Sequence, residues 1–91
     1  MKFTQNTLEK LEKILTETGY IIRYERGSFQ SGYCILETKK VVVLNKFLQL
    51  EGRIQTLFDL IPQLTILPEI LTPDTRKNFE EVLARYAEEE K

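Results

Sequence analysis

The side chains that could carry chemistry in this 91-residue sequence are carboxylates, tyrosines, lysines, arginines and a single thiol, Cys34. Histidine is absent. Histidine supplies most general bases near neutral pH and is the commonest metal ligand, so its absence excludes Ser-His-Asp and Cys-His triads and His-ligated zinc. A single cysteine excludes a thiolate zinc site as well. The sequence therefore predicts no catalytic residue, no metal ligand and no cofactor, in a protein that is not an enzyme.

The remaining reactive groups have simpler structural interpretations. Cys34 lies in an apolar segment, where a small buried hydrophobe fits better than a nucleophile that needs a nearby cation or helix N-terminus. Glu51 and Asp59 stand eight residues apart, and nothing fixes a separation suited to paired-carboxylate catalysis. The four glycines are isolated and form no phosphate-binding loop. We interpret the thiol as core and the carboxylates as solvated surface.

Basic and aromatic residues recur together along the middle of the chain. On a sheet, aromatic side chains can stack on bases while cations hold phosphates. The same segments also carry Glu25 and Glu37, and the net charge is −1, so a nucleic-acid partner is an alternative and not the favoured one. The residues concerned are Arg23, Arg26, Lys39, Lys40, Lys46 and Arg53, with Tyr24, Phe29 and Tyr33.

Segment 27–33 mixes glycine, serine and glutamine with two aromatic residues. Such loops can bind ligands or partners, although we favour the interpretation that Phe29 tucks under a strand connection. The candidate interaction surface that the sequence predicts comprises Phe29, Tyr33, Asn45, Lys46, Arg53 and Asp59.

The first element that must position these residues is an amphipathic helix over 5–18. Leucine and isoleucine recur there at helical spacing, with charged residues opposite. Asn6 or Thr4 can cap its start, and Glu9 follows Asn6 as in a capping box. Gly19 fits the left-handed position that ends a helix.

Three strands follow. Residues 20–26 place Tyr20, Ile22 and Tyr24 on one face, and a second strand covers 31–37. Residues 37–40 suit a hairpin loop. The third strand, 41–44, is wholly apolar, so we expect it to be central with both faces covered.

The helical period returns after Lys46 and must stop or kink at Pro62. The linker 62–72 is rich in leucine and isoleucine, so we expect it to be buried. Thr72-Pro73 is a strong start signal for a last helix over 73–88. The chain thus predicts one α+β domain over 1–91, in the order α-β-β-β-α-α, with a three-stranded antiparallel sheet packed against helices.

No secretory signal region and no apolar run long enough to cross a membrane occur, and secreted domains of this size usually contain several cysteines. We therefore expect a cytoplasmic protein without membrane contacts.

The sequence also resembles a known family. The segments Gly32–Leu36, Val41–Asn45 and Arg53–Leu57 are similar to the core of the ImmA/IrrE-type small zinc metallopeptidases, the minigluzincins. In that family an apolar strand closes on Asn, and a helix follows with Arg and Thr-Leu just before His-Glu-x-x-His. Asn45, Arg53 and Thr56-Leu57 stand in comparable places.

The resemblance implies a fold without its activity. The ligand positions would be Asp59 and Gln63, and the general-base position Leu60, none of which supports zinc hydrolysis. The Tyr24-Glu25-x-Gly27, Gly32–Cys34 and Asn45-Lys46 pattern is also similar to a group of short bacterial proteins with no known activity.

These observations favour a non-enzymatic interaction or structural module that associates with itself, most simply as a homodimer. Its apolar third strand, apolar linker and amphipathic helices supply much apolar surface for 91 residues, and a three-stranded sheet leaves edges to be paired. The alternatives are an inactive metallopeptidase-like domain that binds a peptide or protein, and a nucleic-acid-associated protein. The sequence does not indicate whether a small molecule binds.

Overall fold

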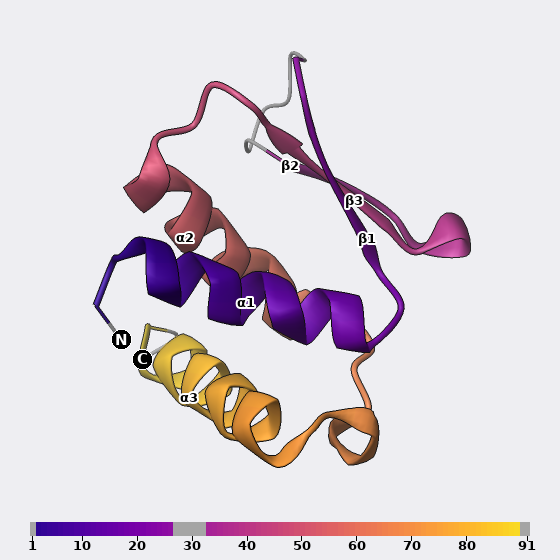
Figure 1. Ribbon diagram of the computed structural model, residues 1–91, viewed down its shortest axis with the longest axis vertical. Helices are drawn as coiled ribbons and strands as arrows, with labels where there is room; N and C mark the ends of the chain where they lie inside the picture. Colours follow the sequence, from indigo (N-terminus) through magenta and orange to yellow (C-terminus); the bar gives the residue numbers. More distant parts are fainter. Residues whose placement is uncertain (1, 27–32, 90–91) are drawn as a thin grey trace.

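Three helices lie on one side of a three-stranded sheet in the computed structural model, which describes residues 2–26 and 33–89 (Figure 1). The elements are α1 (Gln5–Glu17), β1 (Ile21–Glu25), β2 (Tyr33–Leu36), the 3₁₀ turn η1 (Glu37–Lys39), β3 (Val41–Asn45), α2 (Leu50–Leu60), the 3₁₀ turns η2 (Ile61–Gln63) and η3 (Pro68–Ile70), and α3 (Pro73–Glu89). The α+β class and the predicted order of helices and strands are confirmed.

Helix α1 begins and ends where local signals place it. Of the two predicted caps, Thr4 is the one used, because its hydroxyl accepts a hydrogen bond from the Thr7 amide. Gly19 has a φ of 88°, and the Tyr20 amide donates back to the Leu15 carbonyl at 2.9 Å. This is a Schellman ending, which directs the chain straight into β1.

The sheet has the order β1-β3-β2, and its direction corrects the predicted antiparallel sheet. β2 runs antiparallel to β3, but β1 runs parallel to it, so the sheet is mixed. The physical reason is that β1 and β2 run in opposite directions while β3, the most apolar strand, takes the place between them. β3 must then be antiparallel to one neighbour and parallel to the other.

The central position of β3 is confirmed, but the expectation that both of its faces are covered is wrong. Val42 and Leu44 are fully buried against the helices, whereas Val41 and Val43 are only half-buried. Among the described residues, the long helices all lie on one face, so the second face is left without a helical layer (Figure 1). The unbroken run of apolar residues therefore indicates a central strand, but it does not show that two layers cover that strand.

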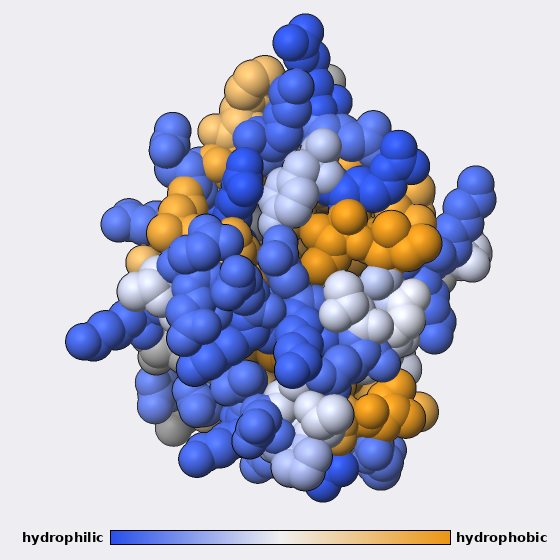
Figure 2. Space-filling view, viewed as in Figure 1, coloured by the Kyte–Doolittle hydropathy of each residue, from blue (hydrophilic) through white to orange (hydrophobic). Residues whose placement is uncertain are grey.

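The segment after α2 is only partly buried, contrary to expectation. Pro62 ends the regular helix as predicted, in the first turn of η2. Leu64 and Ile66 then enter the core, but Leu67 and Ile70 are 56% and 54% exposed. Apolar surface lies over η3 in the space-filling view (Figure 2).

A carboxylate joins the end of α1 to the start of α3. Glu17 accepts hydrogen bonds from the Thr72 amide at 2.9 Å and from the buried Thr75 hydroxyl at 2.7 Å. An anion at a helix N-terminus is favourable because unpaired amides and the helix dipole point at it. Burial raises the pKa of Glu17, but these hydrogen bonds outweigh burial, so its pKa lies below the ordinary value.

We expect Glu17→Gln to lower the free energy of unfolding by about 1–2 kcal/mol at neutral pH, because the charge-assisted bonds weaken. The lowered pKa means that the contribution is complete above the ordinary value of 4.5 and is lost as pH falls through the folded-state pKa. Urea unfolding at neutral and acid pH measures this. The gap between native protein and variant should close in acid, and a pH-independent gap would contradict the assignment. Exposed Glu80→Gln is the matched control.

Candidate interaction surface

The turn between β3 and α2 is built by two of the predicted residues, Asn45 and Arg53. The Asn45 side-chain oxygen accepts from the Phe47 amide at 3.0 Å, and its carbonyl accepts from the Leu48 amide at 3.1 Å. From the first turns of α2, Arg53 donates through Nε to the Leu48 carbonyl at 3.0 Å and through Nη2 to the Lys46 carbonyl at 3.1 Å. Both residues therefore fix the backbone of the turn.

Arg53 also connects this turn to β1. Its guanidinium lies 4.6 Å from the centre of the Tyr24 ring, and the Tyr24 hydroxyl donates to Glu12 of α1. Burial and the bond to Glu12 raise the pKa of Tyr24 well above its ordinary value. Tyr24 is thus held as a protonated donor that links β1 to α1.

The turn displays an aromatic residue that the sequence analysis missed. Phe47 is 61% exposed, with the cationic groups of Arg26 and Lys46 at 5.7 and 5.5 Å from the ring centre. The available signal was an aromatic in the polar stretch after Asn45, where the sequence pattern gives it no buried face. The Asn45 side chain positions the Phe47 backbone, so this side chain stands on a fixed turn.

The structure brings together only part of the predicted surface. Asn45, Lys46 and Arg53 share the turn. Asp59 lies six residues beyond Arg53 on α2, on another helical face, where it is exposed and its carbonyl accepts from the Gln63 side chain. Phe29 lies outside the described residues, and Tyr33 is described only as a backbone position paired with Leu44.

The cations proposed for nucleic acid are dispersed. Arg23 pairs with Glu25 at 3.1 Å, and Arg53 is engaged with the turn and Tyr24. Lys40 lies over Tyr20, away from the Phe47 turn. Within residues 2–26 and 33–89, only Arg26 and Lys46 of these cations meet at an exposed aromatic ring, so the basic patch described there is small.

The positions compared with a zinc site do not form one. Leu60 is fully buried in the core, whereas Asp59 is exposed and Gln63 bonds to the backbone. Among the described residues, no three histidine, cysteine or carboxylate groups lie close enough to hold a metal ion.

A hollow of about 340 Å³ lies between the end of α1 and the segment around η3. Its lining residues are Thr18, Tyr20, Lys40, Thr65, Leu67 and Ile70. Lys40 has a φ of 52°, an uncommon left-handed conformation that lets its carbonyl receive the Ile21 amide. These described lining residues include one cation and no carboxylate, so they form no acid–base pair.

The sheet itself is the larger open surface. On the face away from the helices, Ile21, Val41 and Leu36 lie side by side across all three strands. Ile21 is 57% and Leu36 45% exposed. Figure 2 shows apolar surface beside β1 in the same view as Figure 1.

The outer edge of β1 is open as well. Among the described residues, β1 pairs with β3 alone, and Figure 1 shows β1 crossing in front of the other strands. An unpaired strand edge presents backbone donors and acceptors that another strand can complete. The exposed row and this edge adjoin, so they form one open region of the sheet.

No family model matches the chain, and neither a curated protein nor a solved structure matches it. None of the helices in the described part of the chain is long and apolar enough to span a membrane.

We expect Arg53→Ala to lower the free energy of unfolding by about 2 kcal/mol, because two hydrogen bonds from a charged donor and the contact with Tyr24 are lost together. Urea denaturation measures this. Lys77→Ala, at an exposed position of α3, should change stability by less than about 0.5 kcal/mol. Equal effects of the two substitutions would show that Arg53 does not hold the turn.

Proposed function

We propose that this chain is a non-enzymatic interaction module that associates with a second copy of itself through its β-sheet. The observation that carries the proposal is the one-sided covering of the sheet: as far as the structure describes the chain, an apolar row and a strand edge are open at the same place. Natural proteins normally blunt or cover such edges. A second copy does so with no other component.

The chemistry of the open region supports a protein partner over a small substrate. Ile21 and Leu36 offer apolar area, and the edge of β1 offers backbone hydrogen bonds in a regular row. The exposed Arg23–Glu25 pair adds one positive and one negative charge. A second copy carries the same two charges, so each charge can face its opposite across the contact. A symmetric contact uses one patch twice, and two-fold dimers are the commonest assemblies.

The absence of histidine and the single cysteine support a non-enzymatic role in the cytoplasm. The raised pKa of Tyr24 agrees with this role, because this tyrosine is engaged as a hydrogen-bond donor.

Sedimentation velocity over a concentration series, from low to high micromolar, tests self-association. We expect the mass of the sedimenting species to rise from that of the 10.7 kDa chain to twice that value. Ile21→Ser should weaken association by removing exposed apolar area from the sheet. Leu83→Ser, which removes an exposed apolar side chain from α3, should not. A strict monomer at every concentration would refute the proposal.

A second function, association with single-stranded nucleic acid, is favoured by Phe47 with its two flanking cations. An exposed ring can stack on a base while Arg26 and Lys46 meet phosphates.

Fluorescence anisotropy with a labelled single-stranded oligonucleotide tests this second function. Phe47→Ala should weaken binding about tenfold or more, since one stacked base contributes roughly 1–3 kcal/mol. Binding should also weaken as salt rises. Leu67→Ala, which removes a similarly exposed apolar side chain elsewhere, is the control. Absence of binding at low salt would exclude this function.

A further inference from the structure

We propose that the two copies join through the edges of β1, antiparallel and centred on Tyr24, so that Arg23 of each copy lies opposite Glu25 of the other. The pairing would extend the three-stranded sheet into one of six strands. This inference rests on the proposed self-association and specifies its partner surface and its register.

Backbone geometry limits the possible registers. The Ile21 amide donates to the Lys40 carbonyl at 2.8 Å, and the Glu25 carbonyl accepts from the Lys46 amide at 3.0 Å. Because hydrogen-bonding direction alternates along a strand, positions 21, 23 and 25 point their backbone groups at β3. Ile22 and Tyr24 therefore point theirs at the open edge, where any added strand must bond.

A two-fold contact between β1 strands is antiparallel, and its hydrogen-bonded pairs must join these outward positions. Within β1 this allows three alignments: Ile22 opposite Ile22, Ile22 opposite Tyr24, or Tyr24 opposite Tyr24. The residues between them form the non-hydrogen-bonded pairs, in which Cα atoms are only about 4.5 Å apart and side chains are closest.

The charges distinguish the three alignments. With Tyr24 opposite Tyr24, Arg23 faces Glu25 of the second copy, and the two-fold axis creates this pair twice. With Ile22 opposite Tyr24, Arg23 faces Arg23, which is destabilising for like charges directly opposite. With Ile22 opposite Ile22, Arg23 faces Ile21 and makes no charge pair. Only the first alignment satisfies the charges.

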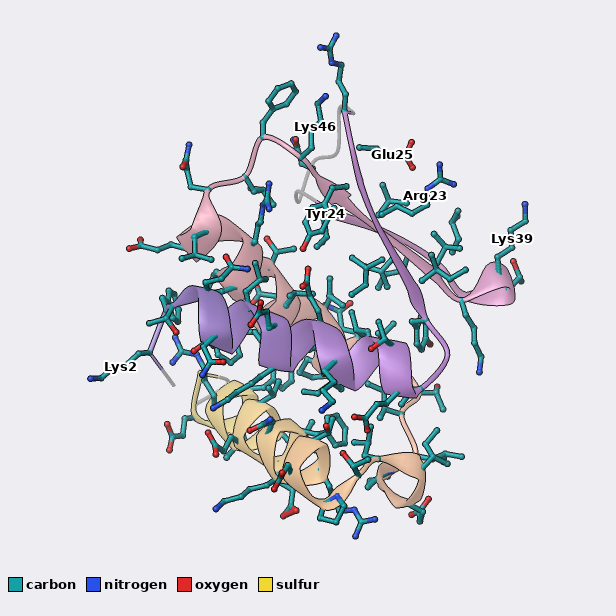
Figure 3. The ribbon with its side chains drawn as sticks, viewed as in Figure 1. Lys2, Arg23, Tyr24, Glu25, Lys39 and Lys46 are labelled. Atoms are coloured by element: carbon teal, nitrogen blue, oxygen red, sulfur yellow. The ribbon has the colours of Figure 1, made fainter. Side chains whose placement is uncertain are left out.

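The side chains are placed to make these contacts. Figure 3 shows Arg23 and Glu25 on the side of β1 away from the helices, and Tyr24 on the helix side. The side chains of Arg23 and Glu25 are 60% and 43% exposed, so both are accessible to a second copy even though they form a salt bridge with each other. The Tyr24 residues meet at the wider, hydrogen-bonded spacing of about 5.5 Å between Cα atoms.

Two single charge reversals test the register. Arg23→Glu gives a chain with two acidic residues at the edge, and Glu25→Arg gives a chain with two basic ones. For each variant alone, the dimer dissociation constant should rise about tenfold or more above that of the native chain, because both cross-strand pairs become repulsive. An equimolar mixture should form a heterodimer as strong as the native dimer, because both pairs are then of opposite sign. Sedimentation with one labelled chain measures dimer formation in each variant and in their mixture.

Lys77→Glu and Glu80→Arg on α3 provide the matched control, because they change the net charge equally at exposed positions away from β1. Both should dimerise as the native chain does, and their mixture should gain nothing. Circular dichroism checks that every variant folds. If the native chain dimerises but the β1 reversals leave dimerisation unchanged, the edge register is wrong and self-association stands. If the native chain is monomeric, both proposals fall.

Discussion

The structure depends on the burial of one face of β3. Val42 and Leu44 are fully buried on that face and join a single core formed with α1, α2 and α3. A chain of this length buries only about two-thirds of its surface, and three helices with their connections complete one layer. No described helix is left for the opposite face. The open row across Ile21, Val41 and Leu36 is thus a consequence of size as much as of sequence.

Covering one face well requires fixed helix directions, and polar groups at the ends of the helices provide them. The Schellman ending at Gly19 turns α1 into β1, and Glu17 at the same end receives the start of α3. At the far end of β3, Arg53 ties the backbone turn to α2 and packs on Tyr24. Residues with chemically versatile side chains are therefore largely occupied in holding the fold. Among the described residues, Arg53, Tyr24 and Glu17 are examples of polar side chains whose contacts are made within the fold.

Local signals in the sequence predicted the elements well, because each depends on neighbouring residues. The cap at Thr4, the ending at Gly19 and the stop at Pro62 are set within one or two turns of chain. The parallel pairing of β1 with β3 could not be predicted in this way, because strand order is decided by competition among segments far apart. The exposure of Leu67 and Ile70 escaped prediction for a similar reason, since their spacing alone does not show whether a neighbour covers them.

The candidate surface was predicted in part for the same reasons. Asn45, Lys46 and Arg53 converge because a short turn joins β3 to α2, and a short connection keeps its residues close. Asp59 is separated from them by helical geometry, which the spacing of six residues already implied. Phe47 was missed because an isolated aromatic in a polar turn has no periodic pattern. Its exposure follows from Asn45 fixing the turn.

The composition of β1 bears on how far an assembly of this sheet can grow. A flat apolar edge pairs with many partners and leads to open-ended stacking, whereas charges on an edge restrict the alignments that are tolerated. β1 carries opposite charges two residues apart on its outer face. Most alignments of two β1 strands therefore place like charges opposite each other or leave a charge without an opposite partner. An isologous contact also consumes the β1 edge of both copies at once. Of the three described strands, β2 supplies the edges that remain, and it differs from β1 in sequence and direction, so pairing through β1 closes at two copies.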